Sequence, residues 1–331
     1  MKLVQTVVAN NFKNIPDKKL IVNKRWGVNT KKQKQHWYTY VWSVMSGFKN
    51  NKNIHLYCDD TGAKISDILH LPYKTKQIVL NDIPNDMWAL AKIKTYSLQD
   101  EPFLHYDYDV IFQNYFPKEA VDHNLYVQNF CKFKELTPFT HLDYINAKNL
   151  CYLFGIKLPD EFKNFNLENI NNLYYANSGL FGGNDIELIN EYSRNVLNTL
   201  NKDVYLTFQK LNGSEKLHVF SLFEEIYPLL LHFKKYNNYN IGSLLETTNT
   251  NIQNIRKDYE AQSKKLGYIH LMGLKYDTPE GIKESLKRYE FTKEEEERAV
   301  YIISNLSDKI EKEVKALYPE HALIIEKIFH S

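Results

Sequence analysis

Along the first third of the chain, short β-type runs alternate with longer stretches whose apolar positions have helical spacing. The β-type runs are Leu3 to Ala9, Ile54 to Cys58, Gln77 to Leu80 and Pro102 to Phe112. The helical spacing predicts helices at about Gln35 to Phe48, Ala63 to Leu71 and Pro84 to Gln99. This alternation predicts an α/β fold with a mainly parallel sheet flanked by helices.

The rest of the chain continues the pattern and then becomes helical. We expect strands at Leu125 to Phe130, Tyr174 to Asn184 and Gly267 to Gly273, and an irregular segment with short helices from Phe133 to Asn172. Helices are expected at Ile186 to Leu200, at Leu217 to Lys235 and from Thr278 onward. We therefore predict a domain of residues 1–276 and a C-terminal helical extension of residues 277–331 that packs on it.

The predicted helix from Leu217 to Lys235 carries two adjacent glutamates. At 100° per residue, Glu224 aligns with an apolar and aromatic stripe, whereas Glu225 aligns with a polar face that includes His232. We expect a partly desolvated Glu224, a hydrated Glu225 and a kink at Pro228.

Two carboxylates stand near the end of an apolar stretch that reads as one buried strand, Pro102 to Phe112. Because strand side chains alternate between faces, we expect Asp107 and Asp109 to project to the same side. Paired carboxylates repel unless a cation lies between them, and their hard oxygens suit Mg²⁺ or Mn²⁺. His105 shares that face but lies further from the carboxyl end of the strand. The alternative is a strand that runs into a polar turn without a ligand.

Composition narrows the class of protein. The 331 residues include 42 Lys and Arg against 40 Asp and Glu, a net charge of +2, so no basic field points to nucleic acid. Three widely spaced cysteines fit a reducing cytoplasm. No apolar run is long enough to predict a transmembrane helix or a signal peptide. We expect a cytoplasmic protein, with peripheral contact at the inner membrane as an alternative. Glycine-rich dinucleotide and P-loop motifs are absent from the sequence.

Three motifs, in their order along the chain, resemble the GT-A class of glycosyltransferases, in particular retaining enzymes of the glycogenin and bacterial lipopolysaccharide galactosyltransferase type. The segment Phe103 to Asp109 is similar to the family's apolar strand ending in Asp-x-Asp. Tyr175 to Leu180 is similar to its Asn-Ser-Gly donor-sugar strand, and His270 to Gly273 resembles its late His-x-x-Gly segment. The likeness covers roughly residues 1 to 276 by motif, and it implies a GT-A-like fold.

The resemblance also implies a set of functional residues. His270 would be the third metal ligand beside Asp107 and Asp109, which favours Mn²⁺ over Mg²⁺. A basic residue that approaches the donor corresponds to Lys92. Lys275 follows His270 by five residues, where the family's lysine follows by six and precedes Pro-Trp, and it would contact the diphosphate. The remaining donor contacts would come from Tyr108, Asn177 and Ser178.

These expectations amount to a metal-dependent enzyme that transfers a sugar from a nucleoside-diphosphate sugar, with UDP as the expected nucleotide, to a hydroxyl acceptor. The acceptor is a glycan, a lipid-linked molecule or a peptide. Asp109 and Glu224 are the predicted catalytic residues. Glu224 would serve as the acceptor base of an inverting reaction, whereas in a retaining reaction the leaving phosphate can take that role. The alternative for Glu224 is a helix-surface glutamate that pairs with a lysine. A sugar-phosphate nucleotidyltransferase and a non-catalytic carbohydrate-binding protein are the alternatives.

Overall fold

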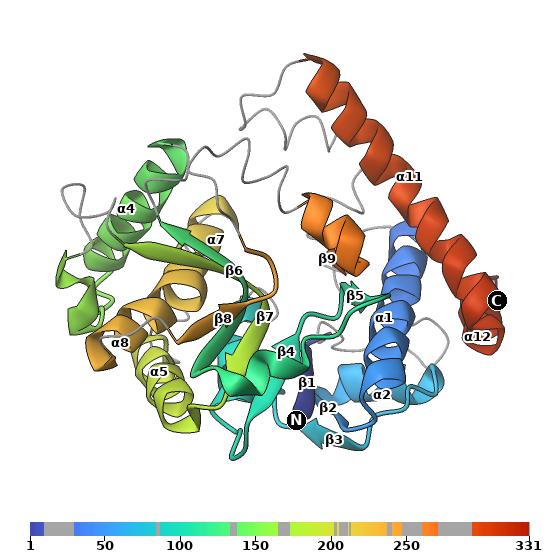
Figure 1. Ribbon diagram of the computed structural model, residues 1–331, viewed down its shortest axis with the longest axis horizontal. Coiled ribbons are helices and arrows are strands. Elements are labelled where there is room, and N and C mark those ends of the chain that lie inside the picture. The colour runs from blue at the N-terminus through green and yellow to red at the C-terminus, as the bar shows by residue number, and fades with distance from the viewer. Residues whose placement is uncertain are drawn as a thin grey trace. The chain divides into compact units, whose positions relative to one another are not determined.

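The structure is a computed structural model, and its sheet confirms the predicted α/β class. It describes residues 1–9, 30–83, 87–132, 138–164, 173–201, 204, 211, 213–236, 240–246, 260–270 and 293–330. A seven-stranded sheet has the order β3 (Thr75–Ile78), β2 (Ile54–Cys58), β1 (Lys2–Val7), β4 (Phe103–Tyr106), β7 (Tyr174–Gly183), β6 (Leu125–Lys132) and β8 (Ile241–Ser243). Helices flank the sheet (Figure 1).

Parallel pairing predominates in the sheet, with one reversed strand. The pairs β2–β3, β1–β4 and β6–β8 are parallel, whereas β7 is antiparallel to both β4 and β6. Two further strands, β5 (Val110–Phe112) and β9 (Tyr268–His270), form a separate antiparallel pair. The glycine pair at the end of β7 allows β7 and its neighbour β4 to approach closely. A Cβ on Gly182 would lie 2.1 Å from the carbonyl oxygen of Phe103, so the missing side chain admits the neighbouring strand.

The chain forms two compact units, each assembled from three segments. The first unit contains Met1–Thr6, Asp86–Asp107 and Pro117–Leu266. The second contains Val7–Asn85, Tyr108–Phe116 and Gly267–Ser331. The predicted boundary between residues 276 and 277 lies outside the described residues and stays a prediction.

The first unit packs its helices around an aromatic core. The helical elements are α3 (Trp88–Tyr96), α4 (Pro138–Leu153), α5 (Ile186–Thr199), α7 (Gly213–Ser221), the π-helical η7 (Leu222–Ile226), α8 (Tyr227–Lys235) and the 3₁₀ turns η3 (Lys118–Asp122) and η5 (Asp160–Asn164). Tyr96 on α3 stacks on Phe181 of β7 with ring centroids 4.5 Å apart. Such offset aromatic contacts add to the area that the rings bury.

Two predictions for this unit were wrong in detail. The segment 133–172 was expected to be irregular, yet α4 runs for 16 residues. Its buried Tyr144, Ala147 and Cys151 recur at helical spacing between polar residues. The helix expected from Leu217 to Lys235 is interrupted by the π-helical turn η7, just before Pro228. A π turn holds an extra residue, so faces calculated at 3.6 residues per turn no longer apply beyond it.

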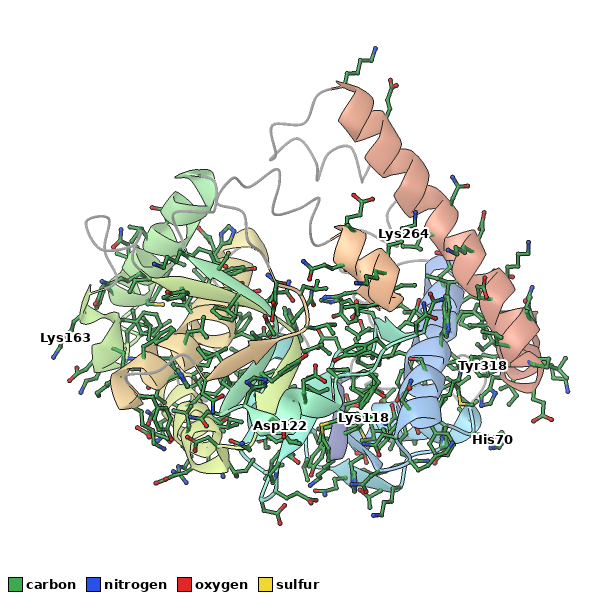
Figure 2. All side chains as sticks on the ribbon, in the orientation of Figure 1. His70, Lys118, Asp122, Lys163, Lys264 and Tyr318 are labelled. Carbon is green, nitrogen blue, oxygen red and sulfur yellow. The ribbon has the colours of Figure 1, made fainter. Side chains whose placement is uncertain are left out.

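In the second unit, the C-terminal helices pack on α1 (Thr30–Asn50). The unit also contains α2 (Asp60–Ile68). The helices α11 (Lys293–Leu317) and α12 (Pro319–His330) run beside α1 in Figure 1. Tyr318, labelled in Figure 2, lies between them. Ile310, Val314, Ala322 and Ile325 join Trp37, Tyr38 and Val41 of α1 in one buried cluster. Apolar contacts thus hold α11 and α12 against α1 within this unit. The predicted division into a domain and a C-terminal extension stays a prediction.

At the edge of this contact lies a group of charged side chains that we call the Glu326 network. Glu326 is 2.8 Å from both Lys34 and Lys315, and it accepts a hydrogen bond from the Tyr38 hydroxyl at 2.8 Å. Glu311 completes the network through Lys315 at 2.7 Å. Burial opposes the charged form of Glu326, but the hydrogen bonds from Lys315, Lys34 and Tyr38 prevail and lower its pKa. None of the described helices is long and apolar enough to cross a membrane.

Candidate functional site

The stretch predicted as one strand is two strands joined by a turn, and the turn contains the Asp-x-Asp motif. β4 ends at Tyr106, Tyr108 and Asp109 form a turn, and β5 begins at Val110. Alternation along a strand therefore does not bring Asp107 and Asp109 to one side, because neither residue lies in a strand. The turn brings them together instead.

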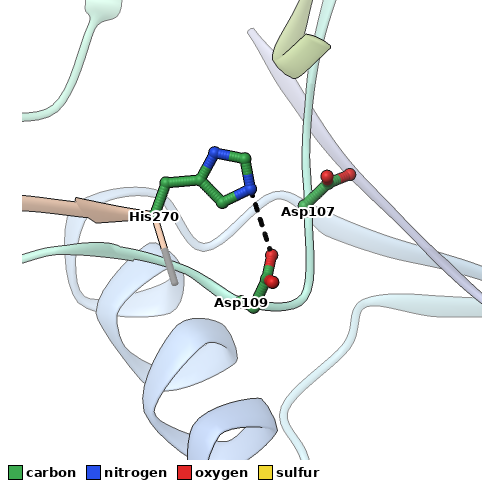
Figure 3. A group of neighbouring side chains, drawn as sticks. All are labelled: Asp107, Asp109 and His270. Atoms are coloured by element: carbon green, nitrogen blue, oxygen red, sulfur yellow. Dashed lines mark ion pairs between the residues drawn. The ribbon is translucent and has the colours of Figure 1, made fainter. Parts of the chain in front are cut away.

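Strand pairing sets His270 beside this turn. In the antiparallel pair β5–β9, Val110 is opposite His270, so the imidazole lies next to Asp109. Its Nε2 is 3.5 Å from an Asp109 carboxylate oxygen, as Figure 3 shows. Asp107, Asp109 and His270 each offer a ligand atom within 4.8 Å of the others. Two carboxylates and one imidazole suit Mn²⁺ or Mg²⁺, so the residues present fit the predicted ion.

Four residues of the first unit form a buried group that we call the Lys92 cluster: Lys92, Asp107, Ser178 and Glu224. The Lys92 ammonium is 2.9 Å from Asp107 Oδ1 and 2.5 Å from Glu224 Oε1. Ser178 Oγ donates a hydrogen bond to the same Glu224 oxygen at 2.5 Å. The cluster joins α3, the end of β4, β7 and η7. Its members were singled out separately by sequence, and the structure brings them together.

The charges of the cluster support one another. Burial by itself lowers the pKa of Lys92, but the carboxylates of Asp107 and Glu224 outweigh burial and raise it. Lys92 is therefore a cation throughout the physiological pH range. The Asp107 backbone N–H donates to the Gly179 carbonyl at 3.0 Å, which fixes the main chain at this carboxylate. Buried charges of this kind are tolerated only when paired and hydrogen-bonded.

His105 behaves as a structural histidine. It is fully buried on β4, and burial, followed by the nearby Lys92 charge, holds its pKa well below the ordinary value. Its ring nitrogens lie 3.4 Å from the Tyr96 hydroxyl and 3.1 Å from that of Thr6. The ring is therefore neutral and contacts a hydroxyl group on each side, although its Nδ1 is also 4.0 Å from Asp107 Oδ1. Whether His270 rather than His105 is the metal ligand stays a prediction.

The prediction that Glu225 is hydrated was wrong. Its side chain is half-buried, and its carboxylate accepts a hydrogen bond from the Tyr144 hydroxyl of α4 at 2.8 Å. Burial, followed by the charge of Glu224, raises the pKa of Glu225 to about 7. His232, expected on the same polar face, is fully buried. The extra residue in the π-helical turn moves both groups away from the faces that a regular α-helix predicts.

The other predicted donor residues have mixed outcomes. The Asn177 side-chain oxygen accepts a hydrogen bond from the Gly179 backbone N–H at 2.9 Å, so it braces its own strand. The Tyr108 ring packs against Tyr40, with centroids 6.3 Å apart. Lys275 lies outside the described residues. The residue that sequence reasoning missed is Tyr144, whose only signal is its place in a helix that was not predicted.

Comparison with known proteins places the chain in a family. A family model described as "Family of unknown function (DUF6734)" matches residues 1–296, so the protein belongs to this family. No curated protein matches the sequence. One solved structure that is similar to the chain is the crystal structure of galactosyltransferase LgtC in complex with donor and acceptor sugar analogs. The identity is 11% and the TM-score 0.34, over 68% of this chain and 71% of that chain. At that TM-score the likeness carries no argument about activity.

Proposed function

We propose that this protein is a metal-dependent glycosyltransferase that moves a sugar from a nucleoside-diphosphate sugar, with UDP as the nucleotide, to a hydroxyl acceptor. The observation that carries the proposal is the group Asp107, Asp109 and His270, whose possible ligand atoms all lie within 4.8 Å of one another. The Asn-Ser-Gly segment on β7 supports it, because Ser178 joins Asp107 through Lys92 and Glu224.

Each residue then has a defined role. Asp107, Asp109 and His270 would hold Mn²⁺ or Mg²⁺, which as a Lewis acid offsets negative charge on the departing diphosphate. Lys92 would supply a fixed positive charge for phosphate oxygens, and Lys275 a second one. Hydrogen bonds from Asn177 and Ser178 to sugar hydroxyls would distinguish donors, because an unpaired buried polar group strongly disfavours the wrong sugar. Tyr108 would contribute an aromatic surface at the donor.

The acceptor base has two candidates on adjacent residues. Glu224 is the residue predicted from the sequence, and it is engaged by Lys92 and Ser178. Glu225 is less enclosed, and its pKa of about 7 suits proton transfer near neutrality. In a retaining reaction the leaving phosphate takes the proton and neither glutamate is required. The acceptor itself is a glycan, a lipid-linked molecule or a peptide.

Thermal unfolding with UDP, in the presence and absence of Mn²⁺, tests the proposal. We expect a stabilisation by UDP that requires Mn²⁺, of about 2.7 kcal/mol at a ligand concentration of 100 times Kd. Asp109→Asn should abolish that stabilisation and leave the circular dichroism spectrum unchanged. Asp160→Asn, on an exposed aspartate of the first unit, is the matched control.

A second pair of variants examines the imidazole. His270→Ala should weaken Mn²⁺-dependent binding of UDP, whereas His105→Ala should lower thermal stability and leave the dependence on Mn²⁺ in place. Equal effects of the two variants would remove His270 from the metal ligands. Stabilisation by UDP that is identical with and without Mn²⁺ would rule out the metal-dependent reaction.

A further inference from the structure

Two partners compete for the carboxylate of Asp107. It belongs to the group of possible metal ligands, and its Oδ1 is also 2.9 Å from the Lys92 ammonium. Lys92 is almost fully buried, so water does not screen its charge effectively. An ammonium group and a divalent ion repel each other strongly at such distances. Full engagement of Asp107 with a metal therefore requires that Lys92 move away from it.

We propose that Lys92 is the resident cation of this site before a metal binds, and that Lys92 releases Asp107 when a divalent ion enters. We further propose that Glu224 is the positioning residue that retains Lys92 during the exchange. This inference rests on the proposed function for the identity of the ion and its ligands. In this inference Glu224 holds Lys92 in place, which is a different role from that of an acceptor base.

The contacts of Glu224 suit it to retain Lys92. Its Oε1 is 2.5 Å from the ammonium, closer than Asp107 Oδ1, and Ser178 holds that same oxygen from β7. The Glu224 side chain is only 3% exposed. The Lys92 ammonium also lies 5.0 Å from the centre of the Trp88 ring, which favours a cation at that position. Lys92 thus keeps the Glu224 carboxylate and the Trp88 ring as partners after it releases the Asp107 carboxylate.

The balance of charge predicts coupling between ligands. One ammonium group lies against two carboxylates, and Asp109 adds a third close by. A divalent ion that binds alone brings a second cation next to Lys92. A nucleoside diphosphate supplies the negative charge that offsets both cations. We therefore expect the metal alone to bind weakly, and the metal and the diphosphate to strengthen each other's binding reciprocally.

The test measures Mn²⁺ binding without nucleotide, by electron paramagnetic resonance of the free ion and by calorimetric titration. Lys92→Met removes the competing cation and should raise the affinity for Mn²⁺ by on the order of tenfold. Glu224→Gln leaves Lys92 with Asp107 as its main charged partner and should lower that affinity by a similar factor. Changes of opposite sign in two members of one cluster are not expected from general loosening of the structure.

Two controls accompany these variants. Lys92→Arg keeps the positive charge and should bind Mn²⁺ within a few-fold of the wild type. Glu187→Gln changes an exposed glutamate of the same unit and should have no effect. A second readout is the ratio of the affinities for Mn²⁺ with and without UDP, which should fall about tenfold or more in Lys92→Met because the coupling is lost. Circular dichroism melts establish that each variant is folded.

The outcomes separate this inference from the proposed function. Mn²⁺-dependent binding of UDP by the wild type supports the proposed function whatever the variants do. If Lys92→Met binds Mn²⁺ no more tightly than the wild type, or if both variants shift in the same direction, the exchange is overturned. Should Lys92→Met fail to fold, the comparison of Glu224→Gln with Lys92→Arg tests the inference. An affinity for Mn²⁺ in Glu224→Gln that equals or exceeds that of Lys92→Arg would contradict the role of Glu224 in holding Lys92.

Discussion

The Lys92 cluster of the first unit and the Glu326 network of the second are built from the same parts. In each, a glutamate is paired with lysine and accepts a hydrogen bond from a hydroxyl group, Ser178 in the first and Tyr38 in the second. They differ in exposure, since the Glu224 side chain is 3% exposed and that of Glu326 is 22% exposed.

They also differ in charge balance. The Lys92 cluster has one lysine for two carboxylates, with Asp109 close by, whereas the Glu326 network has two lysines for two glutamates. A balanced, partly exposed network needs no further ion and serves the docking of helices. A buried cluster with excess negative charge favours a further cation, and this difference is why we propose a functional role for the Lys92 cluster and a structural one for the Glu326 network.

The largest effect on stability is expected from Lys92→Met. Removing the cation leaves the carboxylates of Asp107 and Glu224 facing each other in a buried setting, and breaking a buried ion pair in this way costs about 3–5 kcal/mol. Urea unfolding would measure the loss, with Lys92→Arg as the control that keeps the charge. A loss below about 1 kcal/mol would mean that the cluster is well solvated.

A somewhat smaller loss is expected where the second unit relies on apolar contact. Ile325 on α12 is fully buried in the cluster that joins α12 to α1. Ile325→Ala should lower the free energy of unfolding by about 3 kcal/mol, because it removes buried methyl groups and leaves a cavity. Leu323→Ala, at a position that is 55% exposed, is the matched control and should change it by less than about 0.5 kcal/mol.

Glu225 and Glu326 have pKa values shifted in opposite directions, so their contributions to the free energy of unfolding should change with pH in opposite directions. Burial, followed by the charge of Glu224, raises the pKa of Glu225 to about 7 from 4.5 in the unfolded chain, so folding favours its protonated form. Its contribution to stability is present below pH 4.5 and is lost as the pH rises to about 7, by at most about 1.4 kcal/mol per pH unit. The pKa of Glu326 is lowered, so its contribution is lost on acidification below its unfolded value.

Substitution by glutamine separates the two cases. Between pH 5 and pH 7, Glu225→Gln should gain stability relative to the wild type as the pH rises, whereas the difference between Glu326→Gln and the wild type should stay nearly flat (ordinary glutamate pKa about 4.3). Urea unfolding at several pH values measures both. A flat profile for Glu225→Gln would show that its carboxylate is as hydrated as the sequence alone suggested.

Much of the fold could be predicted from the sequence because the signals are local. β2 was predicted at its observed bounds, Ile54–Cys58, and the helices on either side of it were found at nearly the right places. The helix α4 was missed even though its buried Tyr144, Ala147 and Cys151 recur at helical spacing. The pairing of Lys92 with Glu224 joins residues 132 positions apart, and no local pattern encodes such a contact.

The residues of the candidate site could be chosen from the sequence, but the way in which the fold brings them together could not. Asp107, Asp109 and His270 were chosen by motif, and the structure brings them together through a turn and a strand pair rather than through alternation along one strand. Glu225 was misplaced because the π-helical turn changes the helical register at that point. Such a turn depends on the packing around it, which a sequence pattern does not reveal.

The smallest effect is expected from Lys315→Met in the Glu326 network. Lys315 is 46% exposed, and its removal leaves Glu326 in contact with Lys34 and Tyr38. Water already solvates the lysine well, so the free energy of unfolding should fall by less than about 1 kcal/mol. The difference should shrink further between about 0.1 M and about 1 M salt, because exposed charges are screened. If urea unfolding showed a loss as large as that of Lys92→Met, and independent of salt, burial and charge balance would no longer distinguish the two regions. The C-terminal helices would then depend on their ion pairs rather than on the apolar contact beneath them.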